Sequence, residues 1–383
     1  MIYADNAATT KISDVAFEKM LPFLREQYGN PSSQYSLGVI GRRAIEQARQ
    51  QIAGAIGAEP TEIVFTSGGS EANSWVLRSI AELFIGEEIH IITSCIEHHS
   101  VLNACHELEA KGIEVTYLPV DSCGLVSVSD VKEVTKPNTK LVSIMLANNE
   151  IGTVQPIVEI GQCLHEKGIL FHSDAVQAVG HVALNVKNLS VDFLSASAHK
   201  FNGAKGTGFL YKRSGLDMRR LIYGGEQENG TRGGTENVAG IVAMNYALEE
   251  SITDMPEVDK RMKTMIALTV EGIKRRIPNV RINGDSYIKL PGMVNLGFNG
   301  VAGESLMNLL DLKGICVSTS SACTSGRDEP SHVLMALGLT EQQAKSAIRI
   351  SYGRYNTLQD VESIIVAICT AYNKILGADA NCL

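Results

Sequence analysis

Short apolar runs alternate with longer amphipathic segments over the first part of the chain. Runs rich in β-branched and aromatic residues predict strands in EIVFTS, IHIITS, KLVSIML, GILFHSDAV, VDFLSASA and GTGFLYK. The stretches between them have helical periodicity, as in RRAIEQARQQIAGAI, SEANSWVLRSIAELF and PIVEIGQCLHEKG. This alternation predicts an α/β domain with a mainly parallel sheet that helices cover on both faces.

The pattern changes after residue 224. A glycine-rich polar stretch, YGGEQENGTRGGTEN, precedes two long helices predicted over 235–252 and 257–277. Shorter strands are predicted in VRING, MVNLGF, GICVST and AIRISYG, and a helix in LQDVESIIVAICTAYNKIL. We therefore expect a large domain over 15–256 and a smaller α+β domain made of 1–14 and 257–383.

Composition narrows the classes of function. The net charge of −8 on 383 residues argues against a protein that binds nucleic acid directly through its phosphates. No apolar run reaches the roughly 18 residues of a membrane span, and MIYADNAATT has no signal-peptide pattern. The 8 cysteines are scattered rather than closely paired. We expect reduced thiols, a cytoplasmic protein and no membrane partner.

A glycine turn offers a candidate phosphate site. In IVFTSGGSEANSWVL a strand is followed by Gly68 and Gly69, and Ser70 stands where a helix N-cap is expected. The free amides of that helix would face an anion. The alternative, equally weighted, is a turn with no ligand. No GxGxxG pattern is present, which argues against a dinucleotide site.

Two further predicted strands end in residues that could take part in catalysis or cofactor binding. Lys200 follows the apolar run of SASAHKFNGAKGTG, where a lowered pKa would suit Schiff-base chemistry, and Lys205 is a competing lysine. Asp174 ends the strand in FHSDAVQAVG and would be suited to a cationic partner, with Gln177 close behind. The plain alternatives are a surface lysine and a helix N-cap.

The remaining polar positions are more ambiguous. Asn149, in MLANNEIGTVQP, either turns the chain or binds a ligand, and Arg349, in AIRIS, pairs with a substrate carboxylate or with an internal one. SCIEHHSVLNACHE contains possible zinc ligands, namely Cys95, His98, His99, Cys105 and His106. Their spacing lacks the paired pattern of structural zinc sites, and Cys105 falls on an apolar helix face. One histidine over an aromatic ring is the favoured interpretation.

SSACTSGRDEPSHV places Cys323 among serines, glycine and charges. Free cysteine is ordinarily buried, and exposed free thiols are avoided. A thiol on a polar segment therefore indicates a reactive role, and we expect this segment to be a mobile loop.

The ordered set of motifs resembles one family over essentially the whole chain. YADNAATT, GNPSS, FTSGGSEAN, EHHSVL, NNEIGTVQPI, HSDAVQAVG, SASAHKFNGAKGTG, RGGTEN, SSACTSG and AIRIS occur in this order. The chain resembles the cysteine desulfurases of the NifS and IscS type. That resemblance implies pyridoxal 5'-phosphate as cofactor and the transferase fold type I, with a seven-stranded sheet in its large domain.

The resemblance also implies roles for single residues. Lys200 would form the Schiff base and move protons, Asp174 would pair with the pyridine nitrogen, and Gln177 would contact the phenolic oxygen. The catalytic set is completed by Cys323 as nucleophile and His98 stacked on the ring. The phosphate would be bound by Gly69, Ser70, Ser197, His199 and, from the neighbouring subunit of a homodimer, Thr235. Asn149 and Arg349 would bind the substrate carboxylate, and Asn149 would also contact the cofactor.

The implied reaction removes sulfur from L-cysteine, releases L-alanine and leaves a persulfide on Cys323. The sulfur would pass to an acceptor protein in iron–sulfur cluster assembly or in tRNA or cofactor thiolation. Alternatives are another enzyme of the same fold, such as an aminotransferase, a cystathionine-type lyase or a selenocysteine lyase, and a non-catalytic sulfur-relay scaffold. The former would not need Cys323, and the latter would not need Lys200.

Overall fold

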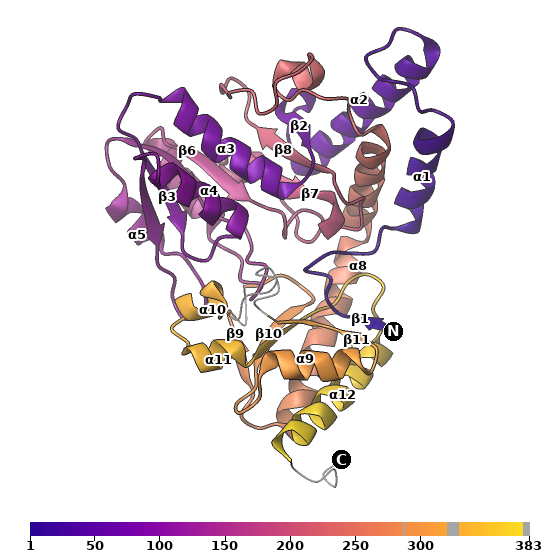
Figure 1. The fold of residues 1–383 in the computed structure, drawn as a ribbon, viewed down its shortest axis with the longest axis vertical. Helices are drawn as coiled ribbons and strands as arrows, with labels where there is room; N and C mark the ends of the chain where they lie inside the picture. Colours follow the sequence, from indigo (N-terminus) through magenta and orange to yellow (C-terminus); the bar gives the residue numbers. More distant parts are fainter. Residues whose placement is uncertain (286–287, 320–328, 378–383) are drawn as a thin grey trace.

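Seven strands form the central sheet of the larger part of the molecule (Figure 1). The computed structural model describes residues 1–285, 288–319 and 329–377. The sheet contains β2 (Ile63–Thr66), β3 (His90–Ser94), β4 (Glu114–Leu118), β5 (Thr139–Ser143), β6 (Leu170–Asp174), β7 (Phe193–Ser197) and β8 (Gly208–Lys212). Their order is β2-β8-β7-β6-β5-β3-β4, and β8 is antiparallel to both neighbours while the other pairs are parallel. The predicted, mainly parallel seven-stranded sheet is confirmed.

The strand patterns explain why most of these strands could be recognised. Ile91 and Ile92 are both fully buried, and they pack into different apolar clusters because successive side chains point to opposite faces. The sheet edge β4 differs, because only Leu118 is fully buried there and polar residues alternate along it. The apolar-run criterion therefore missed β4.

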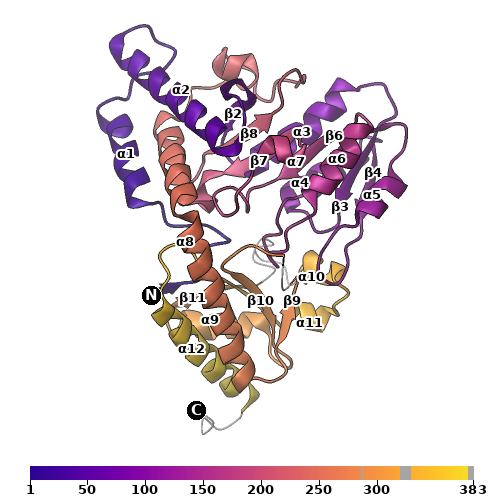
Figure 2. The same cartoon turned by 180° about the vertical axis from the view of Figure 1, so that it is seen from behind.

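Helices cover both faces of the sheet, as predicted. The helices and short 3-10 turns of this part are α1 (Asp14–Arg25), α2 (Ser36–Ile56), η1 (Pro60–Glu62), α3 (Gly69–Leu83), α4 (His99–Glu109), α5 (Val128–Val134), α6 (Ile157–Glu166), α7 (Val186–Leu189), η2 (Ala198–Lys200) and η3 (Gln227–Gly230). Figure 1 shows α3 and α4 in front of the sheet, and Figure 2 shows α2 and α6 on its other side.

A single helix joins the two parts of the molecule. α8 (Val238–Arg276) is 39 residues long and continues through Pro256, so the prediction of two helices over 235–252 and 257–277 is wrong. Proline removes one N–H from the helical ladder, but packing of the flanking turns holds the helix together. Leu248 packs in the apolar core of the large sheet, and Met265 packs in a separate apolar core formed by the smaller part of the molecule. The domain boundary near 256 stays a prediction and falls inside this helix.

The smaller part is an α+β layer below the sheet in Figure 1. Its antiparallel sheet has the order β12-β13-β10-β9, and a separate parallel pair joins β1 to β11. Its strands are β1 (Ile2–Tyr3), β9 (Arg281–Asn283), β10 (Met293–Gly297), β11 (Ile315–Cys316), β12 (Ser318–Thr319) and β13 (Ala347–Ser351). Its helices are α9 (Gly303–Asp311), α10 (His332–Ala336), α11 (Glu341–Lys345) and α12 (Leu358–Leu376). The N-terminus is thereby held in this layer.

The parallel strands bring their carboxyl ends to one edge. The turn after β2, the segment after β5, Asp174 at the end of β6 and η2 after β7 all lie at this edge, where α/β proteins bind ligands. The edge faces the smaller layer. Within the described part of the chain, no helix is both long enough and apolar enough to span a bilayer.

Candidate active site

A cavity of about 520 Å³ opens at this edge of the large sheet. It is lined by most of the residues that the sequence singled out: Gly69, Ser70, His98, Asn149, Asp174, Gln177, Ser197, His199, Lys200 and Arg349. Lys205 lines it as well. Thr235 is exposed and does not line it, and Cys323 lies outside the described residues.

The glycine turn shapes one end of the cavity. Gly68 has a φ of 152° and is the N-cap of α3, so the helix begins at Gly69, and the expectation that Ser70 is the N-cap is wrong. A Cβ on Gly69 would lie 2.3 Å from Cγ2 of Val176, which leaves room only for glycine. No side chain of the described residues caps this helix. Its first amides and the Ser70 hydroxyl are thus placed to bind an anion.

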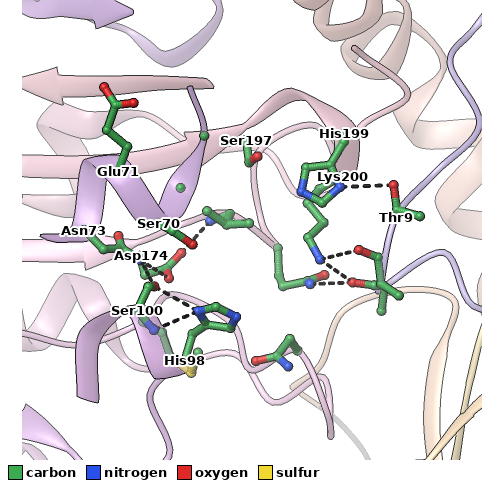
Figure 3. Close-up of a pocket in the computed structure, with 18 of the residues that line it drawn as sticks. Thr9, Ser70, Glu71, Asn73, His98, Ser100, Asp174, Ser197, His199 and Lys200 are labelled. Carbon is green, nitrogen blue, oxygen red and sulfur yellow. Dashed lines mark hydrogen bonds between the residues drawn. The ribbon is translucent and has the colours of Figure 1, made fainter. Parts of the chain in front are cut away.

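Ser197, the last residue of β7, and His199, in the following turn η2, also line the cavity. His199 Nδ1 lies 3.1 Å from Oγ1 of Thr9 (Figure 3). Burial, and then the nearby charges of Lys200 and Lys205, lower the pKa of His199 to about 4. Its ring is therefore neutral near pH 7 and can donate one N–H to a ligand.

Lys200 is oriented by the N-terminal segment. Its Nζ donates to the carbonyl oxygens of Ala7, at 2.6 Å, and Ala8, at 2.9 Å. Gln177 Nε2 donates to the same Ala7 carbonyl at 2.9 Å. Two backbone acceptors therefore fix the direction of the Lys200 amine at the cavity wall, and Figure 3 shows both hydrogen bonds.

Asp174 presents a buried carboxylate at the end of β6. Its side chain is 5% exposed; Oδ2 accepts from Asn73 Nδ2 at 2.6 Å and Oδ1 from the backbone N–H of Val176 at 2.9 Å. It does not cap a helix. A buried carboxylate with neutral donors is a suitable partner for a cationic ring nitrogen.

His98 lies across the cavity as the N-cap of α4. Its Nδ1 accepts from the backbone N–H of Ser100 at 3.1 Å, and Ser100 Oγ lies 2.8 Å from the same nitrogen. Burial lowers the pKa of His98, Asp174 opposes this shift, and Lys200 adds to it. The neutral ring therefore carries its proton on Nε2.

Arg349 enters the cavity from β13 of the smaller layer. It is 4% exposed, and its Nη2 donates to Asp5 Oδ1 while its Nη1 donates to the backbone oxygen of Asn149, both at 2.7 Å. The internal ion pair that the sequence left open is thus present. Nε of Arg349 is buried and has no hydrogen-bond partner among the described residues.

The possible zinc ligands do not assemble. Cys105 lies on the buried face of α4 within an apolar cluster, and the His106 ring contacts the ring of Tyr117. The described ranges contain no group of three or more His, Cys, Asp or Glu side chains that could hold a metal ion.

Sequence reasoning missed four contributors. Asn73 is a polar residue on the apolar face of α3, a signal that could have exposed it. Ala7 and Ala8 act through backbone carbonyls, which side-chain chemistry cannot reveal. Asp5 depends on a contact across 344 residues of sequence.

These residues fit pyridoxal phosphate. The cavity combines an anion-binding helix start, a lysine amine, a buried carboxylate and an imidazole on the opposite side. Asn73 Oδ1 is buried and lacks a partner among the described residues, as expected of an atom that faces a bound group. The sheet and this donor set define an α/β enzyme with a lysine-centred cofactor site at the carboxyl edge.

Comparison with known proteins agrees with this class. The sequence model of the aminotransferase class-V family matches residues 2–364, and the chain belongs to this family, whose enzymes depend on pyridoxal phosphate. A cysteine desulfurase IscS of Clostridium botulinum is 47% identical over 366 residues, which is 95% of this chain and 92% of that protein.

Two solved structures are similar in three dimensions. A NifS-like protein has a TM-score of 0.92 and 39% identity, covering 98% of this chain and 99% of that one. SspA in complex with cysteine has a TM-score of 0.83 and 36% identity, covering 93% and 100%. The predicted family and fold type I are confirmed.

Proposed function

We propose that this chain is a pyridoxal-phosphate-dependent cysteine desulfurase, which takes sulfur from L-cysteine and releases L-alanine. The observation that carries the proposal is the cavity itself: Lys200, Asp174 and Arg349 meet there from two layers of the fold. The relatives named above support the choice of cysteine as substrate. When bound, the cofactor supplies an electrophilic carbonyl for the substrate amine and a conjugated ring that accepts an electron pair.

The described residues divide the work of binding. Asp174, held by Asn73 and the Val176 amide, would keep the ring nitrogen protonated, and the start of α3 with Ser197 and His199 would hold the phosphate. Gln177, tied to the Ala7 carbonyl, would meet the phenolic oxygen. Binding at three points fixes one orientation in the cavity.

Proton transfer falls to Lys200 and His98. The Lys200 amine, oriented by two carbonyls, would take the substrate's Cα proton once released from the cofactor. His98 would stack on the ring and present Nε2–H, since its Nδ1 already accepts from Ser100. Arg349 and Asn149 would bind the substrate carboxylate, Arg349 through an Nε–H that has no hydrogen-bond partner among the described residues.

Sulfur transfer is assigned to Cys323, which lies outside the described residues. Its thiolate would attack the substrate sulfur, so that an S–S bond forms and the Cβ–S bond breaks. The electron pair of that bond remains on Cβ, which takes a proton and gives alanine. Cys323 then carries a persulfide for transfer to an acceptor protein.

The test is incubation of the cofactor-loaded protein with L-cysteine, followed by mass spectrometry of the Cys323 peptide and assay of alanine. We expect one added sulfur on Cys323 in the wild type, no persulfide in Cys323→Ser, and unchanged activity in the control Cys123→Ser. Release of alanine and sulfide that survives Cys323→Ser would favour a lyase of the same fold. Unchanged alanine formation in Lys200→Ala would overturn the proposal.

Assembly and cellular context belong to the same proposal. We place Thr235 in the cofactor site of the neighbouring subunit of a homodimer. Thr235 is exposed and does not line the cavity of its own subunit, and the preceding residues Ile222 and Tyr223 are also exposed. Light scattering should give a dimer, and Thr235→Ala should weaken cofactor binding. The free state of all described cysteines supports a cytoplasmic enzyme serving iron–sulfur assembly or thiolation.

A further inference from the structure

An acidic residue at the start of the chain holds the buried cation of the site. The guanidinium of Arg349 has two occupied nitrogens, with Nη2 on Asp5 Oδ1 and Nη1 on the Asn149 carbonyl, and one buried nitrogen, Nε, with no partner among the described residues. The side chain of Asp5 is 17% exposed and that of Arg349 4%. Asp5 is not among the described residues that line the cavity. The Asp5 carboxylate therefore binds Arg349 from outside the cavity, which leaves the Nε–H available to a ligand.

The backbone fixes Asp5 in this place. Asp5 bridges Ser351 in parallel register at the end of β13, two residues after Arg349. The Ser351 N–H donates to the Ala4 oxygen at 2.8 Å, and the Asn6 and Ala7 amides donate to the Ser351 oxygen and Oγ at 3.1 and 2.9 Å. Three hydrogen bonds to Ser351 thus hold the Asp5 segment beside β13, the strand that carries Arg349.

A second carboxyl group explains why Arg349 needs such a hold. Glu150 is buried next to Asn149, and the charge of Arg349 acts on it, opposing the rise that burial causes in its pKa. A long side chain with two acidic neighbours has two possible partners. The direct bond to Asp5 selects one orientation, and Glu150 instead accepts from Ser331 Oγ at 2.5 Å.

We propose that Asp5 is a positioning residue for substrate recognition: it neutralises Arg349 from behind and fixes the guanidinium so that its Nε–H meets the substrate carboxylate. The proposal rests on the proposed function, because it takes the ligand of Arg349 to be the carboxylate of an α-amino acid. A buried cation without its counter-charge would relocate or draw in water. Loss of Asp5 should therefore weaken carboxylate binding and leave the chemistry at Lys200 unchanged.

The test compares Asp5→Ala and Asp5→Asn with the wild type and with Asp14→Ala, a control that removes an exposed aspartate paired with Lys11. For Asp5→Ala we expect the KM for L-cysteine to rise about tenfold, as for the loss of one charge-assisted hydrogen bond, with kcat within about twofold. Asp5→Asn should recover part of the loss, since the amide oxygen can accept from Nη2. Asp14→Ala should match the wild type.

A pair of competitive inhibitors separates positioning from general damage. The inhibition constant of L-alanine should rise about tenfold in Asp5→Ala, whereas that of L-alaninamide, which lacks the carboxylate, should not change. The proposal is overturned if both inhibition constants rise equally or if neither rises. It is also overturned if Asp5→Asn loses cofactor absorbance and unfolds at a lower temperature to the same degree as it loses affinity for L-alanine. Absence of alanine formation in the wild type would instead count against the proposed function, while L-alanine binding would still report on Asp5.

Discussion

Asn73 connects the two walls of the cavity, and its removal should weaken cofactor binding. It is 1% exposed; its Nδ2 donates to Asp174 Oδ2 at 2.6 Å and to Ser100 Oγ at 2.9 Å, and Ser100 in turn contacts His98. Asn73→Ala deletes both bonds. The Asp174 carboxylate would then keep one described donor, the Val176 amide.

The size of the effect follows from the bond to the charged oxygen. A hydrogen bond to a charged group contributes ~1.5–3 kcal/mol, or about 10–150-fold in a dissociation constant. Because the Val176 amide still orients Asp174, we expect the lower end, about a tenfold weaker affinity for pyridoxal phosphate. The bond to Ser100 is between neutral groups and should add little.

The assay is titration of the apo-protein with pyridoxal phosphate, followed by absorbance, together with thermal unfolding. Asn245→Ala is the matched control, because Asn245 is also a buried asparagine, 4% exposed, and is bonded to Gln51 outside the cavity. Both variants should lose stability, but only Asn73→Ala should lose affinity. Equal cofactor affinities in the two variants would refute the reasoning.

Further predictions concern the frame of the site. Glu228→Gln should lower the free energy of unfolding by about 1.5–3 kcal/mol in urea, because it removes the buried carboxylate that Arg49 bonds at 2.8 and 2.9 Å and leaves this cation with only the exposed Glu46 at 3.3 Å as an ion-pair partner among the described residues. Gly69→Ala should reduce cofactor affinity in the same titration, since its Cβ would lie 2.3 Å from Val176 Cγ2. Burial raises the pKa of Glu150 from 4.5 to about 7, so the folded state binds its proton more tightly. Stability should therefore fall as pH rises between these values, and Glu150→Gln should flatten that decline in urea titrations.

The apolar runs were enough to locate strands that are buried on both faces. β7, for example, is buried at every position and was predicted correctly, whereas the edge strand β4 carries exposed and half-buried residues and was missed. Pro256 illustrates the opposite error. Its local effect predicted the end of a helix, but packing of α8 against α1, α2 and α12 keeps the helix continuous.

The motifs likewise singled out candidate catalytic and binding side chains, and the cavity brings most of them together. The orientation of those side chains was beyond the sequence. Lys200 depends on the Ala7 and Ala8 carbonyls, which any residue could supply.

The fold class followed from the sequence alone, and so did the candidate reactive groups, because apolar periodicity and side-chain chemistry are local properties. The tertiary structure decided which of those groups are paired, and with what. Arg349 meets Asp5 and Asn149, and Lys200 meets the first residues of the chain, across separations of up to 344 residues. Such contacts form only when the smaller layer packs against the carboxyl edge of the large sheet. The spacing of apolar residues along the chain does not predict which residues meet there.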